Sequence, residues 1–277
     1  MRISVSLRCL LLLAVAGATP ALAQEPAPAD TVRPPSPLPP ALSIVADTTV
    51  LPFERPNGAL LRPGATTFDI ASARAGQTQS LGVRTVQVSE SAFAGMPAWL
   101  ITEARTGSAV ETTDSLYLTR AELSPERWVA TSGRSQLAAS FAHDTLYGAL
   151  QSYQGRASFT TGVGPAALVT PGMVERIAEL LPLHYGYHAL ATLVRVELGT
   201  PRGMPAELAV DRDEQVTVGG QAVDCWVLTL RSGTTEERLW VTKEQPRVVK
   251  TEQAFGPSVV TSTLRVTAPA LAPAPSP

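Results

Sequence analysis

Cysteine is almost absent from this chain of 277 residues, which contains only Cys9 and Cys225. Cys9 lies in a leader that we expect to be removed, so a single thiol remains and no disulfide can form within the mature chain. Cys225 stands between Asp224 and Trp226 in an apolar strand pattern, which favours a buried small hydrophobic side chain over a reactive thiol. The fold must therefore be stabilised by its core, and a chain of this length can bury one.

Clustered positive charge is missing as well. The chain has 22 Lys and Arg against 24 Asp and Glu, and its lysines are Lys243 and Lys250. Removal of Arg2 and Arg8 with the leader leaves 22 − 2 = 20 basic residues, a net charge of 20 − 24 = −4. These charges are scattered, whereas nucleic-acid binding needs a basic patch or stripe. We therefore expect no nucleic-acid partner.

Apolar runs long enough to cross a membrane are also lacking. The run from Cys9 to Gly17 is shorter than the roughly 20 residues of a membrane-spanning helix, and Arg2 and Arg8 precede it. Small residues follow up to Ala23, in the pattern that signal peptidase cleaves. Residues 1–23 are therefore predicted to be a signal peptide cut after Ala23, which places the mature chain in the periplasm or outside the cell. No transmembrane segment is expected in the mature chain, and Cys9 stands too early to be a lipoprotein acylation site.

The ends of the mature chain have little to bury. Residues 24–41 are rich in Pro and Ala, and residues 268–277 alternate Ala and Pro. Such compositions favour extended, disordered chain over a packed core. We predict a disordered linker at 24–41, a single β-rich domain at 42–267 and a disordered tail at 268–277.

Within the domain, short segments alternate apolar and polar residues at the period of a half-buried strand, with turn residues between them. Short connections favour antiparallel pairing, and Ser232-Gly233 is typical of a tight hairpin. The sequence predicts a mainly β fold, a strongly curved antiparallel sheet or unclosed β-barrel. Its expected strands are 66–71, 79–89, 98–104, 115–120, 127–131, 135–141, 145–152, 189–198, 206–215, 221–231, 234–242, 247–253 and 259–266.

One segment breaks the strand period. Thr170-Pro171 resembles a helix N-cap followed by Pro at the first helical position. After it, Val174, Ile177 and Leu181 fall on one helical face, and the polar residues Glu175, Arg176 and Glu179 fall on another. We predict one short amphipathic helix that ends near Pro182 and packs its apolar side on the sheet.

Recognisable catalytic motifs are absent. His184 and His188 have the spacing of zinc ligands on a helix, but no Glu follows the first of them and Gly186 interrupts the helical pattern. Ser140, His143 and Asp144 are too close along one strand to cooperate, because neighbours on a strand point to opposite faces. We predict no catalytic residue, no metal site and no cofactor. Gly162-Val163-Gly164-Pro165 is interpreted as a flexible connection, and the acidic residues Asp211, Asp213, Glu214, Glu236 and Glu237 as solvated charges.

Tryptophan gives the main indication of a binding site. The four tryptophans all fall within strand patterns, where they either pack the core or line an apolar cavity on the concave side of a curved sheet. Both interpretations stay open at this point. The candidate ligand-binding residues are these tryptophans and two apolar residues of the helical segment: Trp99, Trp128, Trp226, Trp240, Ile177 and Leu181.

Residues 222–228, 237–243 and 246–252 follow one another in a familiar order, with Gly220 before the first, Leu239-Trp240-Val241 in the second and Val249-Lys250 in the third. This order resembles exported bacterial domains of unknown function related to the lipoprotein-carrier (LolA/LolB-like) superfamily. The resemblance implies an unclosed barrel with a helix against its concave face. In the carriers the enclosed apolar cavity takes up acyl chains.

These observations lead to one main hypothesis and two alternatives. We expect a non-enzymatic, exported envelope protein that binds a hydrophobic or lipid ligand, an acyl chain or a lipoprotein in the concavity of its sheet. The first alternative is a structural or protein-interaction module of the cell envelope with an envelope protein as partner, which a filled barrel would favour. The second is a hydrolase with a dispersed active site, which a histidine beside a carboxylate and a hydroxyl would favour.

Overall fold

A computed structural model describes residues 51–107, 111–164, 166–169, 172–197 and 200–266. These described residues belong to one compact unit. The predicted signal peptide 1–23, the linker 24–41, the start of the predicted domain up to residue 50 and the tail 268–277 lie outside the described residues. Within the described ranges, no helix combines the length and the hydropathy needed to cross a bilayer.

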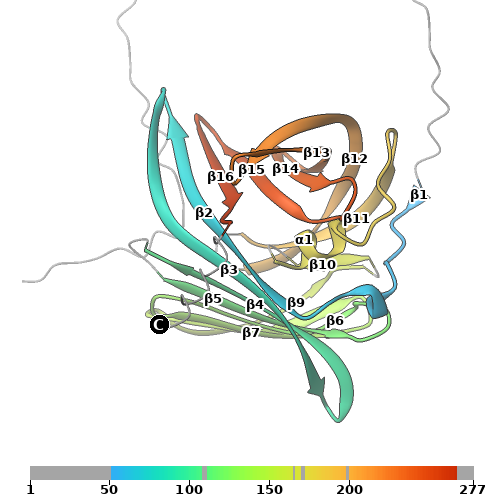
Figure 1. The fold of residues 1–277 in the computed structure, drawn as a ribbon. Helices are drawn as coiled ribbons and strands as arrows, with labels where there is room; N and C mark the ends of the chain where they lie inside the picture. Colours follow the sequence, from blue (N-terminus) through green and yellow to red (C-terminus); the bar gives the residue numbers. More distant parts are fainter. Residues whose placement is uncertain (1–50, 108–110, 165, 170–171, 198–199, 267–277) are drawn as a thin grey trace, which may run out of the picture. The chain divides into compact units, whose positions relative to one another are not determined.

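The described chain is mainly β and forms one sheet of 16 strands that does not close on itself. Along the sheet the strands run in the order β1-β11-β12-β13-β14-β15-β16-β2-β3-β4-β5-β6-β7-β8-β9, with β10 beside β11 (Figure 1). The predicted fold class, a curved unclosed antiparallel sheet with one short helix, is confirmed. The elements are β1 (Leu51–Pro52), η1 (Gly58–Leu60), β2 (Gly64–Arg74), β3 (Gln77–Phe93), β4 (Met96–Thr106), β5 (Thr112–Thr119), β6 (Pro125–Ser132), β7 (Ser135–Ala142), β8 (Thr145–Ser152), β9 (Gly155–Gly162), β10 (Ala167–Val169), α1 (Gly172–Ala178), β11 (His188–Glu197), β12 (Thr200–Val218), β13 (Gln221–Ser232), β14 (Thr235–Thr242), β15 (Val248–Phe255) and β16 (Ser258–Leu264).

Two antiparallel meanders build this sheet. Strands β2 to β9 pair in chain order, strands β11 to β16 do the same, and β16 pairs with β2 to join the two series. The exceptions to antiparallel pairing among the described strands are β1 and β10, which run parallel to β11 along successive stretches of it, β1 at residues 189–190 and β10 at residues 192–194. The predicted hairpin is confirmed: Ser232 pairs with Thr235 across a two-residue turn, where Gly233 has a φ of 58°. A positive φ is easy for glycine and strained for other residues.

Between β3 and β9, the strand pleat separates an apolar concave side from a convex side of small or uncharged residues. A row of directly paired residues on the concave side is almost entirely apolar, and the neighbouring row on the convex side is made of small or uncharged residues. This is the alternation that the period of two in the sequence predicts. The concave row is Val88, Ile101, Leu116, Trp128, Ala139, Gly148 and Phe159, and the convex row is Gln87, Thr102, Ser115, Val129, Ala138, Ala149 and Ser158.

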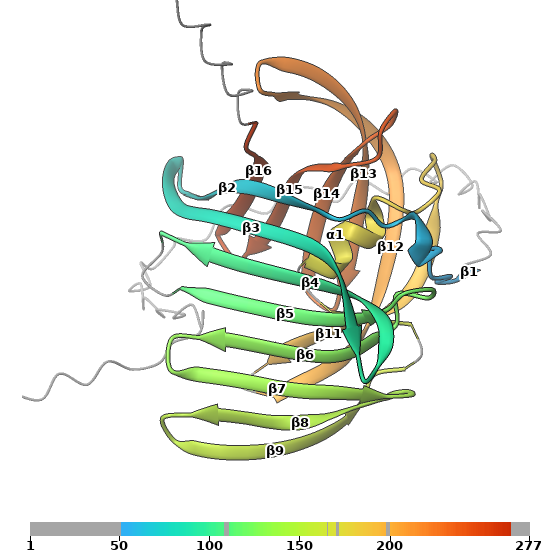
Figure 2. The ribbon, with the colours of Figure 1, turned by 60° about the horizontal axis from the view of Figure 1, so that its bottom comes forward.

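The β9 edge of the sheet approaches β12, near the other end, without pairing with it. At Gly203 in β12, a Cβ atom would lie 2.9 Å from the Gly162 carbonyl oxygen at the end of β9, which only a glycine permits. The rest of β9 has β8 as its partner among the described strands. Figures 1 and 2 show the resulting curl, with the β4–β9 layer facing the β13–β16 layer across the interior.

Helix α1 lies in this interior, on the concave side of the sheet (Figure 2). At its first residue, Gly172, a Cβ atom would lie 3.1 Å from Ile101 Cγ2 and 3.2 Å from Val86 Cγ1, so the helix starts in contact with β3 and β4. The helix ends at Ala178, earlier than the predicted end near Pro182, and the predicted cap at Thr170-Pro171 lies outside the described residues.

The predicted polar face of the helix is buried, contrary to the solvated face that an amphipathic pattern implies. Glu175 and Arg176 are 1% and 8% exposed. The reason is that the curled sheet surrounds the helix, so its polar side also meets strands and finds charged partners there. The apolar side packs as expected, with Val174, Ile177 and Leu181 all buried.

The far half of the β12–β13 hairpin bends out of the barrel and over its convex face. A bulge between Val210 and Arg212 begins the bend, and at the hairpin tip a Cβ atom on Gly219 would lie 3.0 Å from Val266, just after β16. Val216 and Val218 in this hairpin pack against the core. The hairpin therefore covers the outer side of β14–β16, where it arches in Figure 2.

Candidate functional site

The interior of the curled sheet is the candidate site, and its walls are apolar. Fully buried side chains of α1, such as Met173 and Ile177, fill it together with those of the concave row. A cavity between α1 and β4–β6 measures about 10 Å³, roughly the room that one water needs. At this place the interior is filled by the protein itself. Its lining residues are Ile101, Glu103, Asp114, Leu116, Trp128, Val169, Gly172 and Met173.

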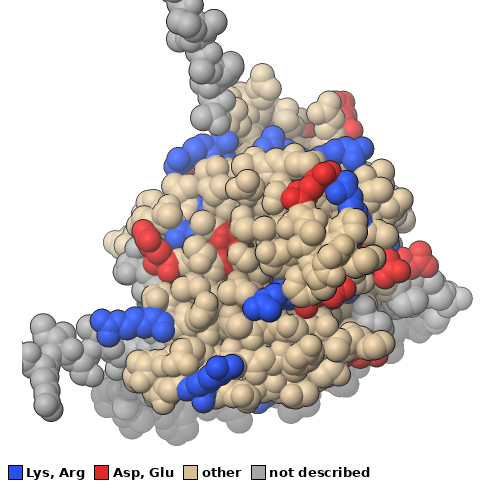
Figure 3. All heavy atoms as spheres, turned by 90° about the horizontal axis from the view of Figure 1, so that it is seen from below, with Lys and Arg blue, Asp and Glu red and all other residues tan. Residues whose placement is uncertain are grey.

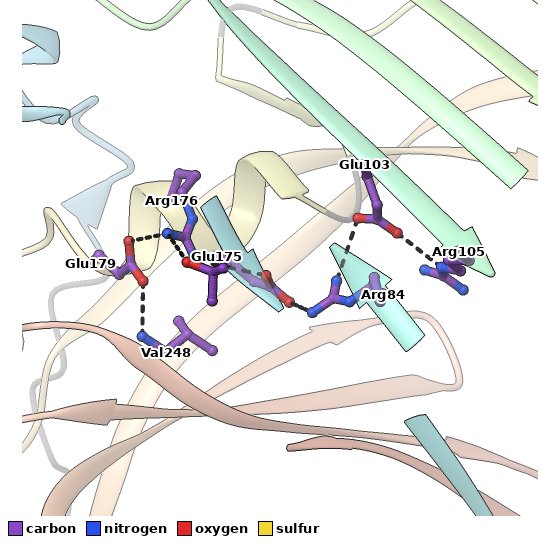
Figure 4. A network of polar contacts seen from close by, with 8 residues as sticks. Arg84, Glu103, Arg105, Glu175, Arg176, Glu179 and Val248 are labelled. Carbon is purple, nitrogen blue, oxygen red and sulfur yellow. Dashed lines mark hydrogen bonds and ion pairs between the residues drawn. The ribbon is translucent and has the colours of Figure 1, made fainter. Parts of the chain in front are cut away.

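A chain of buried charges crosses this apolar interior (Figure 4). Arg84 stands at its centre on the concave side of β3, with its side chain 3% exposed. Its guanidinium donates to Glu103 in β4 at 3.4 Å and to Glu175 in α1. Glu103 also accepts from Arg105 at 2.9 Å. We call Arg84, Glu103, Arg105, Glu175, Arg176 and Glu179 the Arg84 cluster.

The environment of Arg84 keeps it charged. Burial by itself disfavours the charged guanidinium, but the carboxylates of Glu175 and Glu103 outweigh it and raise the pKa of Arg84 above its ordinary value. The guanidinium also lies over the Phe68 ring, 4.6 Å from its centroid. One donor of this buried group, the Nε–H, has no hydrogen-bond partner among the described residues.

On the α1 side, the cluster ties the helix to the second meander. Arg176 pairs with Glu179 at 3.0 Å, and Glu179 accepts from the backbone N–H of Val248 in β15 at 2.9 Å. Burial raises the pKa of Glu179. Because Glu175 reaches β3 and Glu179 reaches β15, these two carboxylates of the helical segment link both layers of the sheet.

Two further carboxyl groups near the cluster bind their protons more tightly than usual. Burial raises the pKa of Asp114 to about 6, although Trp128 donates its indole N–H to it at 3.0 Å. Burial and the charge of Glu175 raise the pKa of Glu237 to about 6. Both groups face the interior, which confirms that its charged groups sit in a poorly solvated environment.

The structure places four of the six candidate ligand-binding residues within the apolar core of the barrel. Trp99 is 1% exposed and donates its indole N–H to the Gly58 carbonyl at 3.0 Å. Trp128 lies in the concave row and lines the small cavity. Ile177 and Leu181 belong to the same buried cluster.

The other two tryptophans do not face this interior, although Trp240 is buried in the same apolar cluster and Trp226 packs against it. Trp240 pairs with Lys250 and Val227, so it stands on the opposite side of β14 from the inward-facing Leu239, beneath the Lys250 side chain. Trp226 is half-buried near the bend of the β12–β13 hairpin, with Lys243 4.2 Å above its ring. The six candidates therefore do not line one common space.

His184, His188 and Cys225 occupy ordinary environments. His188 Nε2 lies 2.8 Å from Glu207 Oε1, and His184 Nδ1 lies 2.9 Å from the Tyr185 carbonyl. Cys225 is fully buried, which raises the pKa of its thiol to about 11. In the described ranges, His, Cys, Asp and Glu form no group of three that could hold a metal ion.

The sequence contains a pattern that could have predicted the Arg84 cluster, although the strand prediction did not use it. Arg84 lies on the same side of its strand as Val86 and Val88, and Glu103 lies on the same side as Ile101. Both charged residues therefore occupy inward positions of apolar strands. A charge at an inward position is rarely buried unless it is paired. Opposite charges on neighbouring strands could therefore have predicted a buried ion pair, though not the third partner on α1.

Comparisons with known proteins bear on the fold alone. No model of a known protein family and no curated protein matches the chain. Among solved structures, the chain is similar to a beta-barrel-like protein of a domain of unknown function, DUF1849, from Brucella abortus. The likeness has a TM-score of 0.50 at 9% identity and covers 74% of this chain and 96% of that one. It supports the barrel-like architecture, while the resemblance to the lipoprotein carriers stays a prediction.

Proposed function

We propose that this chain is a non-enzymatic, exported protein of the cell envelope that binds a hydrophobic or lipid ligand, such as an acyl chain or a lipoprotein, on the concave side of its sheet. The observation that carries this proposal is the apolar concave row of β3–β9, whose part on β3–β6 lies against the seven-residue helix α1. Export rests on the predicted signal peptide at 1–23.

The ligand must exchange places with α1. The cavity of about 10 Å³ has no room for an acyl chain, whereas removal of Met173, Val174 and Ile177 would free an apolar surface on β3–β6. A helix of seven residues is too short to be stable by itself and depends on this packing. An incoming acyl chain would restore the lost burial, which is worth about 25 cal/mol per Å² of apolar surface.

The two carboxylates that contact Arg84 fit a structural role. Glu103 is held between Arg84 and Arg105, and Glu175 is held by Arg84. Carboxylates in these ion pairs anchor α1 and β4 to β3.

The test is native mass spectrometry with lipid extraction on protein purified from the cells that produce it, followed by titration with a brominated long-chain fatty acid. We expect co-purified acyl lipid and quenching of the interior tryptophans Trp99 and Trp128. Trp128→Phe should reduce the quenching, and Trp226→Phe, the matched control outside the interior, should leave it unchanged. A clean protein mass with no fatty-acid uptake would refute the proposal.

A second candidate, a protein-interaction module of the envelope, is favoured by the convex face of β3–β9. Three rows of paired residues cross these strands there, and their charged members are Arg127 and Arg156. The surface over the lower strands of Figure 1 is accordingly mostly uncharged when seen from below (Figure 3). Ala138→Asp on this face should abolish capture of an envelope protein if this candidate is correct, and should leave fatty-acid uptake unchanged.

A further inference from the structure

We propose that the ligand is an anionic amphiphile whose oxyanion headgroup binds Arg84 in the place of the Glu175 carboxylate, so that α1 is the barrel's own internal occupant of the ligand site. This inference rests on the proposed function and names the chemical class of its ligand. An oxyanion on an acyl chain, either a carboxylate or a phosphate ester, has the required chemistry.

The first argument is the match between α1 and such a ligand. Glu175 presents a carboxylate to Arg84, and Met173, Val174 and Ile177 of the same helix present apolar groups to the interior. An anionic head joined to an apolar body is therefore what the site already holds. A molecule with the same two features can make the same contacts once the helix moves away.

The second argument is the unused donor of Arg84. Its side chain is 3% exposed, its two terminal nitrogens contact Glu103 and Glu175, and its Nε–H is unpaired. Guanidinium groups bind carboxylate and phosphate best in a two-pronged arrangement. A freely positioned oxyanion could accept from Nε and a terminal nitrogen together, which Glu175 does not do from its place on the helix.

The third argument is the charge that remains when α1 leaves. Glu175, Arg176 and Glu179 move together, so the interior loses two carboxylates and one guanidinium. Arg84 and Arg105 then share the single carboxylate of Glu103. Arg84 thus loses one of its two carboxylate partners while its side chain stays in a poorly solvated place, where a replacement anion is favoured over a cation.

Three neighbouring groups bear on this balance. Glu237 and Arg195 face the cluster and carry opposite charges. Asp114, at the other end of the small cavity, accepts from the Trp128 indole N–H and, when ionised, offsets the charge of Arg105. The group that loses its partner when α1 leaves is therefore Arg84.

The test compares four amphiphiles that share one chain and differ in the headgroup: dodecanoate, dodecyl phosphate, dodecanol and dodecylamine. Binding to the purified protein is measured by calorimetry below the micelle concentration, at about pH 8, where the carboxylate and the phosphate are ionised. We expect both anions to bind about tenfold or more tightly than the alcohol, as charged hydrogen bonds require, and the amine to bind least. The ratio between dodecanoate and dodecyl phosphate then identifies the preferred oxyanion.

Variants identify the headgroup contact. Glu175→Gln removes the charge that binds α1 to Arg84, so it should raise the affinity for dodecanoate. A merely structural role of Glu175 would not produce this increase. Arg84→Met combined with Glu175→Leu removes the headgroup contact without leaving an unpaired buried charge. It should bind dodecanoate and dodecanol equally, while Arg156→Met on the convex face should keep the preference.

The outcomes separate the two proposals. Equal binding of all four amphiphiles by the unmodified protein would overturn the headgroup assignment and leave hydrophobic ligand binding standing. Binding of none of them would overturn the proposed function itself. Loss of the anion preference in Arg156→Met but not in the double variant would place the headgroup elsewhere on the protein.

Discussion

Replacing Arg84 by methionine should destabilise the protein strongly, because the change leaves buried carboxylates without their cation. Glu103 would keep Arg105 at 2.9 Å, but Glu175 would retain only Arg176, with 4.0 Å between the nearest charged atoms. Removing one partner of a buried ion pair costs about 3–5 kcal/mol. We expect Arg84→Met to lower the free energy of unfolding by an amount in this range.

The double variant Arg84→Met/Glu175→Leu should recover most of the loss. With both charges gone, the site is filled by apolar side chains of similar size, and such replacements are often neutral or stabilising. The stability of the double variant relative to the two single variants then gives the coupling between Arg84 and Glu175 directly.

The assay is urea unfolding followed by tryptophan fluorescence, in which a shifted midpoint at constant slope reports a change in stability. Arg265→Met is the control, since Arg265 pairs with Asp69 on the surface with side chains 46% and 57% exposed; it should leave the midpoint nearly unchanged. The reasoning is refuted if Arg84→Met is no worse than this control, or if the double variant is as unstable as the single one.

Three further predictions concern other parts of the barrel. Burial raises the pKa of Asp114 to about 6 from an ordinary 3.8, so its contribution to stability is complete below about pH 4 and is lost as the pH rises through 6. The free energy of unfolding of Asp114→Asn should fall less between acid and neutral pH than that of the parent, with Glu237 still contributing to the decline; a pH profile identical to the parent's would contradict this. Gly203→Val should lower the free energy of unfolding by about 1–3 kcal/mol, because the new Cβ would meet backbone atoms at 2.9 Å. Gly64→Val, the control with open space around the new side chain, should have the melting temperature of the parent. Trp99→Phe should cost about 1 kcal/mol or more for the lost bond to the Gly58 carbonyl, measurable by thermal melting; a melting temperature equal to the parent's would rule this out.

The sequence predicts most of this fold because the sheet is regular. The alternation in residues 98–104 and 127–131 correctly places strands in β4 and β6, and the turn residues between the segments correctly imply antiparallel pairing. Strand β9 was missed, since Gly155–Gly162 has only Ala157 and Phe159 as apolar inward residues. Strand β10 was missed because three residues carry no period.

The interior was less predictable than the strands. A helical pattern reports which residues share a face, but it cannot report that a sheet will curl around both faces, as it does around Glu175. Similarly, the tryptophans of β13 and β14 fit the strand period equally well on either side. The bend of the β12–β13 hairpin, which gives Trp240 a cover outside the barrel, depends on a bulge at Val210 that no pattern marks.

The most direct test of the account is to lock α1 onto the sheet and measure ligand uptake. A Cβ on Gly172 would lie 3.1 Å from Ile101 Cγ2. The Cβ atoms of residues 172 and 101 are therefore near the separation of about 3.5–4.5 Å that a disulfide requires. In the variant Gly172→Cys/Ile101→Cys, the oxidised form should take up no dodecanoate, and reduction should restore uptake in the same sample. Equal uptake by the oxidised and reduced forms would contradict the claim that the ligand occupies the place of α1.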